Sequence, residues 1–262
     1  FTETARRIRM VSAVATAGLI VAYAVTLLVG LLSLSSSDAP IGDPMFTMLE
    51  VLILALMPAM VTLIAALHAR APERYRVMTL VAVVFMGLLA CVTSSVHFLV
   101  LTLSRAPEFA GQSWAPLVLS FRWPSVVYAL DILAWDVFFP LVMFFAAPSV
   151  TGSRLADWIR RLMIVSGVLA LAGLSGVIVG DMQLRNVGIL GYVGVFLIVA
   201  ILLFFIRGWS AAGQALRNPR QLGLLTLASI AIAINWTTYV YSVSTDQVVE
   251  SALGYFINPL VS

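Results

Sequence analysis

The chain has 262 residues, of which 61% are hydrophobic and only 10% are charged, and its mean hydropathy is +1.05. No soluble core needs so much apolar surface, so this composition excludes an ordinary soluble domain. The formal net charge of +3 comes from 15 basic residues that are all arginines in short stretches beside apolar runs, which favours anionic lipid headgroups as partners and argues against nucleic-acid binding.

Long apolar runs predict an all-α, polytopic transmembrane helix bundle. A helix needs about 20 apolar residues to cross the hydrocarbon core of a bilayer, and only helices or closed barrels satisfy their backbone polar groups there. The runs are continuous and lack the period-two alternation of barrel strands. We expect seven full spans, at 10-33, 45-67, 77-103, 125-147, 162-180, 187-206 and 222-243.

Both ends of the chain break the pattern of complete spans. An eighth apolar run opens near Val249 and stops at Ser262, which is too short to cross a membrane. The chain also begins at Phe1 and not at a methionine. We therefore expect a truncated eighth helix and a fragment at both ends, with a processed N-terminus as the alternative for the start.

The positions of the arginines predict the orientation of the helices. Twelve of them lie in groups of three at the N-terminus and at every second gap, and the other gaps hold only Arg105, Arg122 and Arg185. Short loops rich in arginine stay on the cytoplasmic side during insertion. We therefore expect a multi-pass protein of the bacterial cytoplasmic (inner) membrane, with its N-terminus in the cytoplasm.

Three ionisable residues are expected at one depth in the outer half of the membrane. Glu50 and Asp131 lie a similar distance inside two spans that run inward, and His97 lies in the outer third of a span that runs outward, one turn after Ser94. Ionisable groups in lipid are costly, so they are functional candidates. We predict a small polar cavity open to the outside, with these side chains as proton or ligand groups. The alternative is that each is hydrogen-bonded between helices, with its carboxyl protonated, and holds the bundle together.

Asp136 lies deeper in the fourth span. It is five residues from Asp131, or about 140° round an α-helix, so we expect the two carboxylates not to share a face. This spacing argues against a paired-carboxylate acid-base site. Asp136 remains a candidate for the cavity or for a contact with a neighbouring helix.

Motifs for metals, cofactors and catalysis are not visible in the sequence. His68 and His97 are expected at opposite membrane depths and so cannot ligate one iron from two sides. No Cys or His cluster has zinc spacing, and no nucleophile lies at a suitable spacing from a base. We therefore expect neither a cofactor nor an enzyme. A Gly-x-x-x-Gly pattern at Gly176 and Gly180, with Gly173 beside it, predicts close helix approach in the fifth span.

The last quarter of the chain has a polar and aromatic helix face of its own. Asn235 and Tyr239 lie four residues apart, and such a face can line a pathway through the membrane. Pro259 removes a backbone donor and would open a helix where a pocket needs free backbone groups. The alternative is that the aromatic residues are interface anchors and Pro259 lies in the first turns of a helix. The substrate-pathway candidates are Asn235, Trp236, Tyr239, Tyr255, Asn258 and Pro259.

The string ESALGYFINPL at 250-260, with AINW and YSVSTDQVV before it, resembles RarD-type permeases of the EamA branch of the drug/metabolite transporter superfamily. Members of that family typically have ten helices in two repeats. The resemblance implies that 207-262 is a truncated piece of such a transporter, holding the loop after its second helix, its third helix and the start of its fourth. Residues 1-206, with stretches such as SSVHFLVLTLSR, more faintly resemble an uncharacterised bacterial membrane protein family.

The sequence therefore predicts two regions, a six-helix membrane region of unknown function at 1-206 and a partial RarD/EamA-like segment at 207-262. We expect a fragment or fusion that carries part of a small-molecule transporter and does not transport on its own, because alternating access needs both repeats. The alternative is a membrane-embedded binding or sensing protein that uses the polar cavity near Glu50, His97 and Asp131.

Overall fold

A computed structural model of the chain describes residues 3-34, 41-109 and 111-205. The chain divides into two compact units, Phe1–Gly208 and Trp209–Ser262, and all described residues belong to the first. Every regular element in this described part is a helix. The expected seventh span and truncated eighth run lie outside the described residues, as do the candidates Asn235, Trp236, Tyr239, Tyr255, Asn258 and Pro259.

The described part of the chain contains six helical segments that are long and apolar enough to cross a membrane. By this measure the chain is a multi-pass membrane protein. The segments are Val11–Leu32, Met45–His68, Glu73–Leu103, Val126–Ser149, Arg154–Val179 and Met182–Phe204.

The first three segments are nearly unbroken helices, whereas the last three are composite. The first three are α1 (Glu3–Leu32), α2 (Met45–His68) and η1 (Glu73–Tyr75) with α3 (Arg76–Leu103). The fourth is built from α5 (Val126–Ile132), η3 (Leu133–Phe138), α6 (Phe139–Ala146) and η4 (Ala147–Ser149). The fifth is α7 (Arg154–Ala172) with α8 (Ser175–Val179), and the sixth joins η5 (Met182–Arg185), α9 (Asn186–Ile189), η6 (Leu190–Val195) and α10 (Phe196–Phe205). The long connection before α5 holds η2 (Pro107–Phe109) and α4 (Ala115–Leu119).

The fifth span begins earlier than the sequence predicts, at Arg154 and not at residue 162. The Ser153 hydroxyl caps the helix by accepting a hydrogen bond from the Ala156 backbone N–H at 3.1 Å. The first turns are amphipathic, with Ile159 fully buried and Trp158 exposed. A search for continuous apolar runs misses such turns because they carry polar residues on one side.

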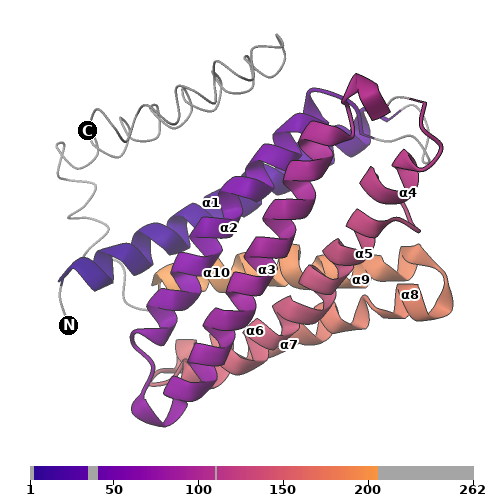
Figure 1. Cartoon of the computed structure of the whole chain (residues 1–262). Coiled ribbons are helices and arrows are strands. Elements are labelled where there is room, and N and C mark those ends of the chain that lie inside the picture. The colour runs from indigo at the N-terminus through magenta and orange to yellow at the C-terminus, as the bar shows by residue number, and fades with distance from the viewer. Residues whose placement is uncertain (1–2, 35–40, 110, 206–262) are drawn as a thin grey trace, which may run out of the picture. The chain divides into compact units, whose positions relative to one another are not determined.

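The six spans pack in chain order and close into a ring. α1 packs on α2, α2 on α3, α3 on α6, α6 on α7, and α7 on α10, which returns to α1. Figure 1 shows α10 running beside α1, although these elements stand at opposite ends of the described chain. This closure leaves an interior that receives side chains from all six spans.

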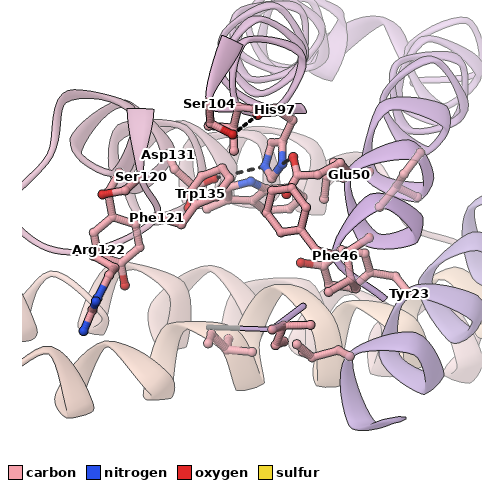
Figure 2. A pocket seen from close by; sticks show the side chains of 18 of the residues that line it. Tyr23, Phe46, Glu50, His97, Ser104, Ser120, Phe121, Arg122, Asp131 and Trp135 are labelled. Carbon is pink, nitrogen blue, oxygen red and sulfur yellow. Dashed lines mark hydrogen bonds and ion pairs between the residues drawn. The ribbon is translucent and has the colours of Figure 1, made fainter. Parts of the chain in front are cut away.

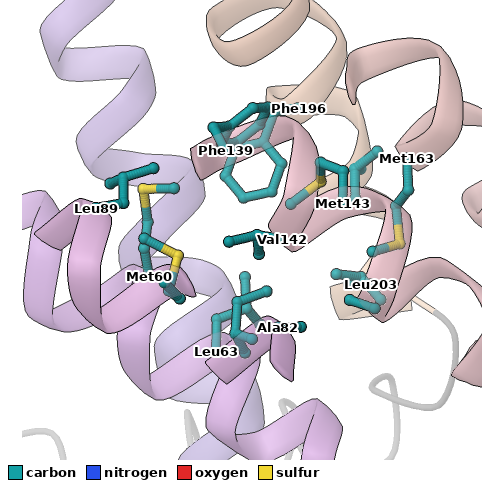
Figure 3. Packing of buried hydrophobic residues seen from close by; sticks show 14 of the residues in the cluster. Met60, Leu63, Ala82, Leu89, Phe139, Val142, Met143, Met163, Phe196 and Leu203 are labelled. Atoms are coloured by element: carbon teal, nitrogen blue, oxygen red, sulfur yellow. The ribbon is translucent and has the colours of Figure 1, made fainter. Parts of the chain in front are cut away.

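One end of the interior is filled by large apolar side chains, shown in Figure 3. Met60, Leu89 and Met143 are fully buried there, and the rings of Phe139 and Phe196 meet edge to face with centroids 5.2 Å apart. Lipid is as apolar as these side chains, so close packing and not expulsion from water holds the spans together. The flexible methionines fill the irregular gaps between the spans.

Glycines bring the fifth and sixth spans close together, and one member of the predicted Gly-x-x-x-Gly pair takes part. A Cβ on Gly191 would lie 2.6 Å from the Ser166 carbonyl oxygen, and the Ser166 hydroxyl donates to the Gly191 carbonyl at 2.8 Å. A Cβ on Gly176 would approach the Arg185 backbone nitrogen to 2.9 Å. Gly180, in contrast, ends α8 with φ of 80° and faces open space. The predicted close approach is therefore confirmed at Gly176 and at its neighbour Gly173, whose Cβ would lie 3.2 Å from the Gly188 Cα, whereas Gly180 takes no part because it serves the turn.

Candidate functional site

A cavity of about 710 Å³ lies between the spans and adjoins the apolar core, with which it shares Ile53, Leu56 and Trp135. It extends from the connections before α2 and α5 to buried residues of the fourth and sixth spans. Its ionisable lining residues other than tyrosine are Asp43, Glu50, His97, Arg105, Arg122, Asp131 and Arg185. Its aromatic lining residues other than histidine are Tyr23, Phe46, Phe121, Tyr128, Trp135 and Tyr192. Figure 2 shows how rings and carboxylates share this space.

Glu50 of α2 and His97 of α3 form a buried pair. The His97 Nδ1 and the Glu50 Oε2 are 2.7 Å apart, and only 6% of His97 is exposed. The other ring nitrogen, Nε2, lies 3.6 Å from Asp131 Oδ1, which is within ion-pair range but too long for a hydrogen bond. Among the described residues this nitrogen has no hydrogen-bond partner.

Arg185 bridges two carboxylates of the fourth span. Its Nη2 donates to Asp131 Oδ2 and its Nε donates to Asp136 Oδ2, both at 2.9 Å. Its guanidinium also lies 4.7 Å from the centre of the Tyr128 ring. Only 5% of Arg185 is exposed. One arginine therefore joins the fourth and sixth spans inside the bundle.

The position of Arg185 corrects the sequence analysis, which counted it as a loop charge. The Asp181 side chain accepts a hydrogen bond from the Gln183 backbone N–H at 2.9 Å and starts η5 at once, so the sixth segment begins at Met182 and not at residue 187. Arg185 therefore belongs to the helical segment, and its side chain is buried in the interior. The two aspartates inside the fourth span could have predicted a buried cationic partner, since buried carboxylates need a cation.

The expectation that Asp131 and Asp136 do not share a face is also wrong. The residues between them belong largely to η3, which is a π-helix. A π-helix bonds residue i to i+5, so residues five apart lie nearly above one another. Both carboxylates can then reach the single guanidinium of Arg185.

Asp136 is held against the fifth and sixth spans by glycines. Its side chain is fully buried, and its Oδ1 has no hydrogen-bond partner among the residues the structure describes. A Cβ on Gly173 or on Gly188 would come within 2.7 Å and 2.6 Å of this oxygen. The bare glycine backbones therefore leave the space that the Asp136 carboxylate occupies.

Of the other sequence candidates, Ser94 is half-buried and does not line the cavity. His68 lies at the far end of α2, where its Nδ1 is 2.8 Å from the Thr79 hydroxyl. The structure thus brings together Glu50, His97 and Asp131, and adds Asp136 through Arg185. Within the described ranges, no three His, Cys, Asp or Glu side chains are arranged to hold a metal ion.

The sequence analysis also missed the aromatic walls of the cavity. The rings of Trp135 and Tyr192 lie 5.0 Å apart, and the Phe121 ring lies 4.8 Å from that of His97. Tyr23 lies on α1, the first span, and lines the same cavity as Trp135 of the fourth span and Tyr192 of the sixth. Aromatic residues are common in membrane helices, so their types alone could not single out these positions.

The whole set forms one chain of polar contacts, from Glu50 through His97, Asp131 and Arg185 to Asp136. Such a chain can bind a polar or charged group, and it can hold or pass a proton. The longest contact in this series is the one between His97 Nε2 and Asp131 Oδ1, at 3.6 Å, and both residues line the cavity. A bound group with hydrogen-bond donors or acceptors could therefore interact with both side chains at this point.

Comparison with known proteins confirms the resemblance to RarD-type permeases. The chain is 51% identical over 65 residues to Protein RarD of Streptomyces exfoliatus, a stretch that covers 25% of this chain and 21% of that protein. It is 46% identical over 70 residues to the uncharacterized transporter YojE of Bacillus subtilis, covering 26% and 24% of the two chains. It is 31% identical over 67 residues to Protein RarD of Escherichia coli, covering 26% and 23%.

These matches are partial. The chain spans between a fifth and a quarter of the length of these curated relatives. No family model and no solved structure matches it. The chain therefore combines apolar helices long enough to cross a membrane with one stretch that is similar to transporters.

Proposed function

We propose that the protein joins a six-helix ligand-binding unit to part of a RarD-like small-molecule transporter in a bacterial cytoplasmic membrane. The observation that carries the binding function is the buried chain of charged contacts that lines the cavity. Ionisable groups inside membrane spans face a partner or a pathway by default. Here four of them line one cavity, and a fifth, Asp136, is joined to them through Arg185.

The size and chemistry of the cavity support a small-molecule ligand. Ligand pockets usually measure about 300–1,000 Å³ and combine apolar walls with a few convergent polar groups. The volume of about 710 Å³ lies within this range, and rings such as Trp135 and Tyr192 stand beside Asp131 and His97. Exposed Asp43 and Arg105 line the same cavity and offer a polar approach to it.

The RarD-like stretch supports the second part of the proposal. The relatives are several times longer than the matched stretch, and secondary transporters bind their substrates between two repeats. A stretch of 65 to 70 residues supplies too little of that architecture to alternate between two openings. We therefore propose that this stretch does not transport by itself.

The binding function can be tested by thermal unfolding of the purified protein in detergent with a library of small polar molecules. We expect at least one chemical class to raise the melting temperature of the wild type and not that of Asp131→Asn. Asp157→Asn is the matched control, because Asp157 forms an exposed ion pair with Arg160, away from the cavity lining. Equal shifts in wild type and Asp131→Asn would contradict the proposal.

Transport is tested separately, with the protein in lipid vesicles and the ligands found by that screen. We expect uptake to equal that of vesicles without protein. Uptake above this background that is abolished by heat denaturation would show that the chain transports, and that part of the proposal would be wrong.

A further inference from the structure

We infer that the cavity takes a protonated amine with an apolar, ring-sized body. This inference rests on the proposed binding function and names the chemical class of its ligand. It follows from the charge of the buried groups, from an unpartnered nitrogen at the cavity and from the aromatic walls.

The buried charges favour a cation. The buried residues of this contact network include three carboxylates, those of Glu50, Asp131 and Asp136, and the single arginine Arg185. The other charged lining residues, Asp43, Arg105 and Arg122, are exposed. His97 adds one positive charge at most, so negative charge is in excess in both protonation states of its ring. Electrostatic attraction is strong at such a site because little water screens it. A monovalent cation reduces the imbalance, and an anion increases it.

Asp136 contributes as an ionised group. Its Oδ2 accepts a hydrogen bond from the Arg185 Nε, as a carboxylate does. Its Oδ1 faces Gly173 and Gly188 and has no hydrogen-bond partner among the described residues. The charge-assisted bond from Arg185 is the contact that favours the ionised form.

The unpartnered nitrogen of His97 favours a cation with N–H groups. Because Nδ1 faces the Glu50 carboxylate, Nδ1 carries the proton in the neutral ring, and in that form Nε2 is a bare acceptor. Nε2 lies 3.6 Å from Asp131 Oδ1, and only 6% of His97 is exposed. In the neutral form of the ring both atoms accept hydrogen bonds, and in the protonated form Asp131 Oδ1 remains an acceptor. One ammonium group has enough donors for both atoms. A quaternary ammonium has none.

The walls of the cavity accommodate the rest of the ligand. Two rings of the lining already hold resident cations, with Arg185 over Tyr128 at 4.7 Å and Arg105 over Phe46 at 4.6 Å. The rings of Tyr23, Trp135 and Tyr192 line the same space without a resident cation above them in the described contacts. An ammonium near these faces gains cation–π attraction, and an apolar body packs against them.

The test uses four probes of one shape, measured by calorimetric titration of the full chain in detergent. They are phenethylamine, its trimethylammonium analogue, phenethyl alcohol and hydrocinnamate. We expect phenethylamine to bind at least about tenfold more tightly than each of the others, the scale of one charge-assisted hydrogen bond. Tighter binding of hydrocinnamate or the alcohol would overturn the amine assignment and leave the binding function standing. Equal binding of the trimethyl analogue would overturn the role of the N–H groups, and binding of none of the four would overturn the inference as a whole.

Variants place the binding in the cavity. We expect Asp131→Asn to weaken phenethylamine binding about tenfold or more, and Tyr23→Leu to weaken it about threefold through loss of a ring face. Asp157→Asn should leave the affinity unchanged. Tyr23 takes part in no ion pair among the described residues, so Tyr23→Leu keeps the test decisive if Asp131→Asn does not fold. Unchanged affinity in Tyr23→Leu and in any folded Asp131→Asn would show that the amine binds elsewhere, and the inference would fail.

Discussion

Arg185 is placed where a single side chain pairs with two buried carboxylates and ties two spans together. Burying three charges costs several kcal/mol each, and ion pairing with good geometry offsets part of this cost. The Nε and Nη2 contacts at 2.9 Å supply one such bond each to Asp136 and Asp131. Removal of the arginine would leave both carboxylates without their cation.

We predict that Arg185→Gln lowers the free energy of unfolding by about 3–5 kcal/mol, the usual cost of breaking a buried ion pair. Arg160→Gln is the control, because its pair with Asp157 is about 40–50% exposed and worth at most about 1 kcal/mol. Denaturant titration of both variants in mixed micelles measures the difference. Equal losses in the two variants would mean that Arg185 carries no special energetic role.

Asp43 supplies a prediction about pH at the approach to the cavity. Slight burial would raise its pKa, but hydrogen bonds from the Thr47 hydroxyl at 2.6 Å and from Arg105 outweigh this and hold the pKa below its ordinary value of 3.8. A depressed folded-state pKa stabilises the fold above pH 3.8, and the contribution is lost as pH falls through the folded-state pKa. Carboxyl NMR should give a midpoint below 3.8, and Arg105→Gln should move it upward. A midpoint unchanged in Arg105→Gln would contradict this account.

At the scale of the elements, two π-helical segments meet at the cavity. η3 and η6 meet through the Trp135 and Tyr192 rings, whose centroids are 5.0 Å apart. π-helical segments are rare and occur frequently at functional sites. Here η3 turns Asp131 and Asp136 toward one partner, and η6 presents Gly191 to the fifth span.

We predict that Gly191→Ala destabilises the protein by about 1–3 kcal/mol, as overpacking of a tight contact does. The new methyl group would lie 2.6 Å from the Ser166 carbonyl oxygen and 2.8 Å from the Ala170 nitrogen, both of them backbone atoms that cannot swing away. Gly194→Ala is the matched control in the same π-helical segment, because nothing lies within 4 Å of its Cβ position. Thermal unfolding in detergent measures both, and similar melting temperatures would refute the close contact.

At the scale of the whole molecule, the arginine pattern predicts which ends of the spans face the cytoplasm. Cys91 is the single cysteine of the chain, so Cys91→Ser provides a background for site-directed labelling. Exposed Ser113 and Thr151 lie in connections at opposite ends of the fourth span. We expect a membrane-impermeant maleimide to label Ser113→Cys in intact cells, and to label Thr151→Cys only after permeabilisation. The reverse pattern would invert the predicted topology.

Much of the fold within the described residues follows from hydropathy. All six described spans contain the core of a predicted one, because some 20 apolar residues in a row have no other stable place than a bilayer. Starts that depend on caps were misplaced, as at Ser153 and Asp181, since a single hydrogen bond from a polar residue sets them. Glu50, His97 and Asp131 could be selected because charge is rare inside spans.

The sequence by itself determined that this is a helical membrane protein, where the apolar core of each described span lies and which carboxylates need a partner there. Only the tertiary structure decided that Arg185 is this partner, that Asp131 and Asp136 share it and that aromatic rings from several spans surround them. The physical reason is range. Hydropathy acts over neighbouring residues and can be summed along the chain, whereas a π-helical register and contacts between residues some 50 positions apart depend on how all six spans pack.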